Sequence, residues 1–165
     1  MTKGFTLIEL LVSLSIFSIV ASFAAPSLHR FIQKQHLIAD ISTVLSLMNS
    51  AKNEAIKSNT NITICGKSSA AECSRNWQEL KVQSPINHQL LYSAKLTGNY
   101  RSVMWSSFQR KTSLIFNARG YTDHLNGSLY FCHTRYPELN RVIRVSKSGR
   151  ATIYSDKKSI GKRCD

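Results

Sequence analysis

Near the N-terminus, Glu9 is a single carboxylate in an apolar run, and such a carboxylate requires a cationic partner. The run covers residues 5–25, which is 21 residues, and Glu9 is its one charged side chain. An ionised carboxylate inside a membrane-spanning helix costs at least ~2–3 kcal/mol and usually has a partner. Cleavage between Gly4 and Phe5 would create an ammonium group on Phe5. In an assembly of helices this ammonium would meet Glu9 of a neighbouring chain, so the pattern predicts a carboxylate that guides assembly.

The four cysteines are the second chemical group, and all of them follow the apolar run. An even number of cysteines in an exported segment favours disulfides over free thiols. Three pairings are possible. We favour Cys65–Cys73, which closes a short polar loop, and Cys132–Cys164, which ties down the C-terminal tail. A structural zinc site is the alternative use, although the Cys-x2-Cys spacing of zinc ribbons is absent.

The remaining polar residues show no catalytic arrangement. Cys132 and His133 are neighbours, but their side chains would point to opposite faces of a strand. The sequence has no Gly-x-Ser-x-Gly elbow and no glycine-rich phosphate loop. We therefore expect no enzyme activity, no metal and no cofactor. Surface positions are expected for the five histidines, which are His29, His36, His88, His124 and His133.

Basic residues concentrate in the C-terminal part of the chain. The formal charge is +13, and residues 101–165 hold 13 Lys and Arg against 4 acids. Such a segment could bind DNA through its phosphates, without sequence preference and with strong salt dependence. The alternative is ordinary solubilising charge on an edge hairpin, where it discourages aggregation. Tyr154 is the one aromatic residue close by, so base stacking would contribute little. The candidate DNA-binding residues are Arg144, Lys147, Arg150, Lys157, Lys158, Lys162 and Arg163.

The apolar run predicts a helix that positions Glu9 in a membrane. Its length meets the ~20 residues that a spanning helix needs and exceeds the core of a secretory signal. The small residues of "ASFAAP" leave conventional signal cleavage as an alternative. Pro26 predicts a kink or a break.

An amphipathic helix is predicted over residues 26–58. Its polar face, expected in solvent, comprises Gln33, Asp40, Asn49, Lys52 and Asn53. Its apolar face, expected to pack on a sheet, comprises Leu28, Ile32, Ile38, Ile41, Leu45, Met48 and Ala55.

Short β-branched and aromatic runs separated by polar turns follow from about residue 60. They predict a twisted antiparallel sheet, and the whole chain reads as one α+β unit with a helical stalk and a sheet head over residues 59–165. In the run from Arg141, alternation would place Ile143 and Val145 on one side and Val142 and Arg144 on the other. The candidate strands are residues 61–65, 77–82, 89–96, 102–108, 113–117, 128–133, 141–147 and 151–154.

The stretch "KGFTLIELLVSL" resembles the prepilin signature of type IV pilins and type II secretion pseudopilins. The resemblance implies the pilin fold and a leader, residues 1–4, that a prepilin peptidase cuts after Gly4 at the cytoplasmic face. It also implies methylation of the Phe5 amine and a role for Glu9 in recruiting the subunit to the filament. Residues 5–25 would anchor the chain in the bacterial inner membrane with the head in the periplasm. The assembled chain would then lie with other pilins at or near the filament tip.

The head resembles minor pilins and pseudopilins of the FimT/GspH type. The resemblance rests on "ITICGKSSAAEC", "LIFNARGYTDHLNGSLYFC" and "RVIRVSKSGRATIY". FimT-type members are linked with DNA capture in natural transformation through a C-terminal Gly-Arg-x-Arg motif. Here the motif reads Gly149, Arg150, Ala151, Thr152, so Arg150 alone carries over and other cations would have to assist. The alternative within the class is a GspH-like pseudopilin or a FimU-like minor pilin that acts in assembly without binding DNA.

Overall fold

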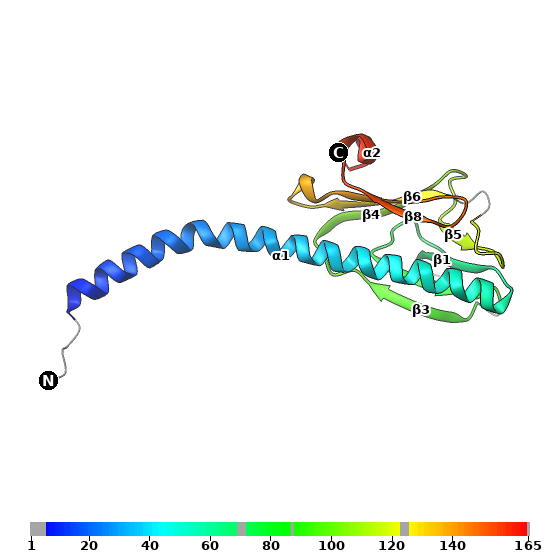
Figure 1. Ribbon diagram of the computed structural model, residues 1–165, viewed down its shortest axis with the longest axis horizontal. Coiled ribbons are helices and arrows are strands. Elements are labelled where there is room, and N and C mark those ends of the chain that lie inside the picture. The colour runs from blue at the N-terminus through cyan, green and yellow to red at the C-terminus, as the bar shows by residue number, and fades with distance from the viewer. Residues whose placement is uncertain (1–5, 69–71, 87, 123–125, 165) are drawn as a thin grey trace. The chain divides into compact units, whose positions relative to one another are not determined.

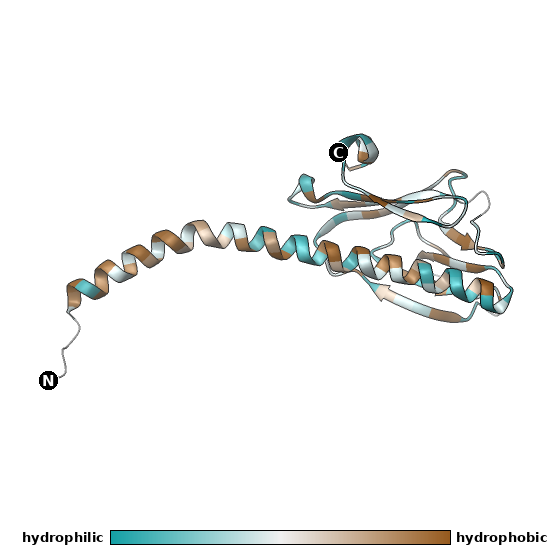
Figure 2. Ribbon diagram, in the orientation of Figure 1, coloured by the Kyte–Doolittle hydropathy of each residue, from teal (hydrophilic) through white to brown (hydrophobic). Residues whose placement is uncertain are grey.

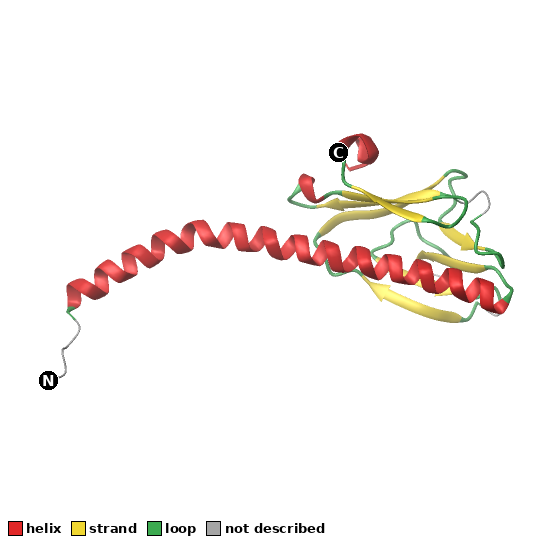
Figure 3. Cartoon of the chain, viewed as in Figure 1, coloured by secondary structure: helices red, strands yellow, loops and turns green. Residues whose placement is uncertain are grey.

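The computed structural model describes residues 6–68, 72–86, 88–122 and 126–164. The chain forms two compact units, Met1–Gln35 and His36–Asp165, and helix α1 (Leu7–Ser58) contributes to both. The described part of the first unit is almost entirely helical, and the second carries the strands (Figure 3). The leader at residues 1–4 and the cleavage site between Gly4 and Phe5 lie outside the described residues.

A capping box begins α1 in the first unit. The Thr6 backbone N–H and hydroxyl both donate to Glu9 Oε2 at 2.9 Å, and the Glu9 N–H donates to Thr6 Oγ1 at 3.3 Å. Large apolar side chains follow and are exposed, among them Phe23, and hydrophobic colour dominates this stretch in Figure 2. By length and composition, α1 could cross a membrane. The helix continues through Pro26, so no break occurs there.

In the second unit, α1 buries one face against the strands. Its buried apolar side chains, Leu37, Ile41, Val44, Met48, Ala51 and Ala55, recur at helical spacings of three, four and seven residues. Ile41, Met48 and Ala55 were predicted on this face, and Leu45 packs at its margin. The same prediction was wrong for Leu28, Ile32 and Ile38, which are exposed. Leu28 and Ile32 precede the second unit, which starts at His36, and Leu37 takes the buried position next to Ile38.

The described residues form eight strands, which are labelled where there is room in Figure 1. All the pairings between strands are antiparallel, and they divide the strands between two four-stranded sheets where the sequence predicted one. Sheet A has the order β3-β2-β1-β5, and sheet B has the order β4-β6-β7-β8. The strands are β1 (Ile62–Gly66), β2 (Glu79–Gln83), β3 (Leu90–Lys95), β4 (Tyr100–Ser107), β5 (Ser113–Phe116), β6 (Gly127–His133), β7 (Arg141–Val145) and β8 (Ala151–Tyr154).

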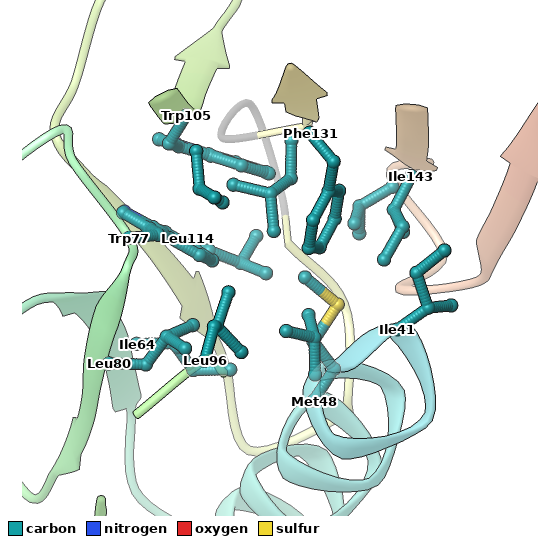
Figure 4. Close-up of a cluster of buried hydrophobic side chains, with 14 of the residues drawn as sticks. Ile41, Met48, Ile64, Trp77, Leu80, Leu96, Trp105, Leu114, Phe131 and Ile143 are labelled. Atoms are coloured by element: carbon teal, nitrogen blue, oxygen red, sulfur yellow. The ribbon is translucent and has the colours of Figure 1, made fainter. Parts of the chain in front are cut away.

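One hydrophobic core joins α1 and both sheets. Ile64 and Leu80 enter it from sheet A, Phe131 and Ile143 from sheet B, and Met48 from α1 (Figure 4). Trp77 and Trp105 stack within it, with ring centroids 4.8 Å apart. Both tryptophans of the chain are therefore buried, and their fluorescence reports on unfolding of the second unit.

Asp40 contradicts its predicted solvent position, because it is 4% exposed. Its carboxylate accepts hydrogen bonds from the Thr97 N–H at 3.0 Å, the Gly98 N–H at 2.8 Å and the Tyr100 hydroxyl at 2.9 Å. Burial and the bond to Asp40 raise the pKa of Tyr100, so the phenol stays protonated and donates. These bonds satisfy a charge that would otherwise be costly to bury. Asp40 therefore fixes the turn between β3 and β4 on α1.

Candidate functional site

The face of sheet B that points away from the core carries polar and basic side chains. Ser106 of β4 pairs with Ser128 of β6, Ser128 with Arg144 of β7, and Arg144 with Thr152 of β8. Paired residues project to the same side of a sheet, so these four form a row across it. Their neighbours along the strands, such as Ile143, point into the core. We call this the outer face of sheet B.

The C-terminal tail covers part of the outer face. It comprises α2 (Lys157–Ile160) and the 3-10 helix η2 (Gly161–Cys164). Asp156 caps α2 by accepting from the Ser159 N–H at 2.8 Å, and this hydrogen bond, aided by Arg144, lowers the pKa of Asp156. The tail forms a second buried cluster of Cys132, Val142, Ile160 and Cys164, with Tyr130 and Tyr154 at its margin. The row through Arg144 stays open beside it.

An open groove runs along this uncovered row, and we call it the β7–β8 groove. Its basic side chains are Arg144 and Arg150, both exposed. Serine and threonine hydroxyls and three aromatic rings, those of Phe108, Tyr130 and Tyr154, also line it, together with Asn126, Gly127 and Val145. No Asp or Glu is among the described residues that line it. The groove can therefore accept a polyanion, with guanidinium groups and hydroxyls as donors to phosphate oxygens.

Aromatic rings and a tight turn position the two arginines. The Arg144 guanidinium lies over the Tyr154 ring, 4.7 Å from its centroid. Arg150 follows Gly149, whose φ of 74° suits the turn between β7 and β8. A Cβ on Gly149 would lie 2.6 Å from the Gly120 carbonyl oxygen, so a larger residue would force the turn to move.

Hydrogen bonds hold this turn on the second unit. The Ser146 N–H donates to the Arg150 carbonyl at 3.0 Å, and the Arg150 N–H donates to Ser146 Oγ at 3.2 Å. From outside the turn, Thr122 Oγ1 donates to the Ser146 carbonyl at 3.0 Å and Lys52 Nζ donates to the Ser148 carbonyl at 3.2 Å. Lys52 was predicted on the solvent face of the helix, and its side chain holds the turn that carries Arg150.

The seven basic residues predicted for DNA binding are only partly brought together. Arg144 and Arg150 line the β7–β8 groove. Arg163 lies over the Tyr130 ring, 5.8 Å from its centroid, at the edge of a second groove. Lys147 lies in the turn after β7, outside the described linings of both grooves. The other three, Lys157, Lys158 and Lys162, are exposed on α2 and η2 and are likewise absent from both described linings.

The second groove adjoins the first at the turn between β4 and β5, and we call it the β4–β5 groove. With Arg163, its basic side chains are Arg75, Arg110 and Lys111. Arg75 Nη2 donates to the Arg110 carbonyl, which connects the loop before β2 to this turn. None of these three was among the predicted site residues. The signal was present in "FQRK", an aromatic residue and two cations directly after a strand.

None of the described histidines lines either groove. His133 was expected at the surface, but it is 2% exposed, and its Nδ1 accepts hydrogen bonds from the backbone N–H groups of Arg135 and Tyr136, both at 3.1 Å. Within the described part of the chain, no cluster of three His, Cys, Asp or Glu side chains could hold a metal ion. The cysteines form the disulfides Cys65–Cys73 and Cys132–Cys164, the pairing favoured from the sequence.

Loss of the tail disulfide should destabilise the second unit. Cys132 and Cys164 are separated by 32 residues, so Cys132→Ser/Cys164→Ser should lower the free energy of unfolding by about 3–4 kcal/mol. For Cys65→Ser/Cys73→Ser, with a separation of 8, we expect about 2–3 kcal/mol. Urea unfolding followed by tryptophan fluorescence measures both. A smaller effect at the tail than at the short loop would contradict the assigned role of the tail disulfide.

Comparisons with known families give two matches. The model of the type II transport protein GspH family matches residues 40–149, and that of the prokaryotic N-terminal methylation motif matches residues 1–25. The first match covers the C-terminal part of α1 and the strands from β1 to β7, including Arg144. The second covers Gly4, Phe5 and Glu9. A search of curated proteins returned no match.

Two solved structures share the fold. Both are of the type IV minor pilin FimU from Pseudomonas aeruginosa. One aligns with a TM-score of 0.62 at 15% identity and covers 82% of this chain and 99% of its own. The other aligns with a TM-score of 0.57 at 14% identity and covers 77% and 98%. The long helix packed on antiparallel strands is thus the fold of a type IV minor pilin.

Proposed function

Since the chain belongs to the type II transport protein GspH family and carries the N-terminal methylation motif, we propose that it is a FimT-like minor type IV pilin that binds extracellular DNA. Binding is through phosphates and without sequence preference, and it serves DNA uptake in natural transformation. The observation that carries the proposal is the β7–β8 groove, where Arg144 and Arg150 are exposed beside hydroxyls and aromatic rings.

The chemistry of this groove suits a phosphate backbone. Guanidinium groups bind phosphate oxygens through paired N–H donors, and hydroxyls add neutral donors. Thr152 occupies the position of the second arginine of the Gly-Arg-x-Arg motif and lies beside Arg144 in the row across sheet B. Arg144 therefore supplies a guanidinium next to the position where the motif has its second one. Lys147, Lys157, Lys158 and Lys162 add charge around the groove and steer DNA toward it.

The N-terminal unit supplies the anchor in this proposal. A prepilin peptidase removes residues 1–4 at the cytoplasmic face and methylates the amine of Phe5. The helix of residues 5–25 holds the chain in the bacterial inner membrane, with the head of residues 59–165 in the periplasm, until assembly with other pilins. Its exposed apolar side chains then pack on neighbouring helices in the filament. The basic head is carried at or near the tip, where retraction draws bound DNA inward.

The proposal predicts that Arg144→Gln/Arg150→Gln weakens DNA binding. Full-length protein in nonionic detergent is titrated into a fluorescein-labelled 20-base-pair duplex at ~50 mM salt. We expect the dissociation constant to rise roughly tenfold or more, because two phosphate contacts are lost. The matched control is Lys57→Gln/Arg135→Gln, which removes two exposed charges from the end of α1 and from the loop after β6. Equal weakening by both double variants would mean that net charge, and not the groove, attracts DNA.

Assembly without DNA binding is the second candidate function. The absence of the second motif arginine favours it, because Thr152 carries no charge. In that case the chain acts as a GspH-like pseudopilin or a FimU-like minor pilin in filament assembly, and its cations serve solubility. Absence of binding by the wild-type chain at ~50 mM salt would support this candidate.

A further inference from the structure

The β7–β8 and β4–β5 grooves are neighbours on the outer face of sheet B. Ser106, Ser107, Phe108 and Tyr130 line both grooves, so the two grooves meet at these four residues. The β4–β5 groove is as free of acids as the first, since no Asp or Glu is among its described lining residues. Asp156 interacts with Arg144 but is not among the described lining residues of either groove, so the described linings of both present cations and hydroxyls to a polyanion.

The far end of this path carries its own cations on a well-formed turn. Arg110 and Lys111 are exposed and lie between β4 and β5. The Arg110 N–H donates to the Ser107 carbonyl at 3.1 Å, and Ser107 Oγ donates to the Lys111 carbonyl at 3.1 Å. Arg75 holds the turn from the other side through the Arg110 carbonyl. The two cations thus have a fixed backbone from which to meet phosphates.

Phe108 stands where the two grooves meet. Its side chain is 83% exposed, although the Phe108 N–H is held by the Asn126 carbonyl at 3.1 Å. Tyr130, which also lines both grooves, lies under the Arg163 guanidinium. Exposed aromatic rings between cations are the arrangement with which proteins bind single strands, because bases stack on the rings while the cations track the backbone.

We propose that the nucleic-acid site extends from the β7–β8 groove into the β4–β5 groove, where Arg110 and Lys111 bind phosphates and Phe108 stacks on an unpaired base. This extension rests on the proposed DNA-binding function and specifies its ligand as a strand with unpaired bases. It adds residues from the β4–β5 turn to a site otherwise assigned to the C-terminal part of the chain.

The first arm of the test removes the distant cations. Full-length protein in nonionic detergent is titrated into a labelled 20-nucleotide oligothymidylate over a range of salt concentrations. Arg110→Gln/Lys111→Gln should bind roughly tenfold more weakly, and its salt slope should be less negative by about 1.4, which is ~0.7 for each contact to a single strand. Arg110→Lys/Lys111→Arg keeps both charges and should bind like the wild type. If this charge-conserving variant loses as much affinity as Arg110→Gln/Lys111→Gln, the loss comes from a disturbed turn, and the proposed phosphate contacts of the two residues are wrong.

The second arm removes the ring. Phe108→Ala should weaken binding to the oligothymidylate roughly tenfold with an unchanged salt slope, because stacking releases no counterions. Binding to a 20-base-pair duplex should be unchanged, since paired bases are not available to the ring. An equal loss for duplex and single strand, or no loss for either, would overturn the stacking role.

The outcomes separate this inference from the proposed function. If Arg110→Gln/Lys111→Gln binds like the wild type while Arg144→Gln/Arg150→Gln binds weakly, the extension is wrong and the DNA-binding function stands. If the wild-type chain binds neither the oligothymidylate nor the duplex at ~50 mM salt, both are wrong.

Discussion

Glu9→Ala is expected to abolish incorporation of the chain into filaments while leaving it in the membrane. In the proposed assembly, the Phe5 ammonium of one subunit meets Glu9 of a neighbour in an apolar surrounding. Removing one partner leaves the other charge unpaired there, which costs several kcal/mol per contact. Within the described residues, the Glu9 carboxylate accepts hydrogen bonds from Thr6 at the start of α1, so Glu9→Ala should leave the stability of the second unit unchanged.

The measurement is an immunoblot of sheared filaments and of the membrane fraction from cells with the matching assembly machinery. Gly4→Ala should instead leave residues 1–4 uncut, which mass spectrometry of the purified chain detects. Ser15→Ala is the control, because it lies in the same exposed part of α1 and carries no charge. Normal incorporation of both Glu9→Ala and Gly4→Ala into filaments would contradict the proposal that the chain assembles as a pilin.

Asp40→Ala is expected to be strongly destabilising. It leaves the Thr97 and Gly98 N–H groups and the Tyr100 hydroxyl without their acceptor. Each unsatisfied buried donor costs ~1–3 kcal/mol, so the free energy of unfolding should fall by about 3–5 kcal/mol. Urea unfolding of the full-length protein in nonionic detergent, followed by the fluorescence of the buried tryptophans, measures the loss.

Two further variants test the cause of that loss. Asp40→Asn keeps one acceptor oxygen and should lose less stability than Asp40→Ala. Asn53→Ala changes an exposed residue of the same helix and should stay within ~0.5 kcal/mol of the wild type. A loss below ~1 kcal/mol for Asp40→Ala would show that water replaces the carboxylate and that the turn before β4 does not depend on it.

Sequence pattern located the elements better than their arrangement. All eight predicted strands overlap the observed ones, and residues 151–154 coincide with β8, because alternation and turn residues are local signals. The division into two sheets depends on the pairing of β5 with β1, whereas β4 and β6, its neighbours in sequence, belong to the other sheet. Local sequence patterns do not determine such a long-range pairing. The predicted solvent position of Asp40 was wrong for the same reason, because its hydrogen-bond partners lie 57 to 60 residues away in the sequence.

The candidate site was predicted only in its C-terminal half. Charge excess pointed to Arg144 and Arg150, and strand alternation correctly separated Arg144 from Ile143 and Val145. The composition does not indicate that the turn between β4 and β5 adjoins the same face. That position results from the pairing of β4 with β6. Phe108 was assigned to a strand, and its exposure became apparent only because β4 ends at Ser107.

The central claim is that the outer face of sheet B binds DNA, and the most direct test is the salt dependence of duplex binding by the full-length wild-type chain. We predict that log affinity falls linearly with log salt, with a slope near −0.9 for each phosphate contact, and that Arg144→Gln/Arg150→Gln makes the slope less negative by about 2. A wild-type chain that binds neither the duplex nor the oligothymidylate at ~50 mM salt, or a slope that the double variant leaves unchanged, would contradict the claim.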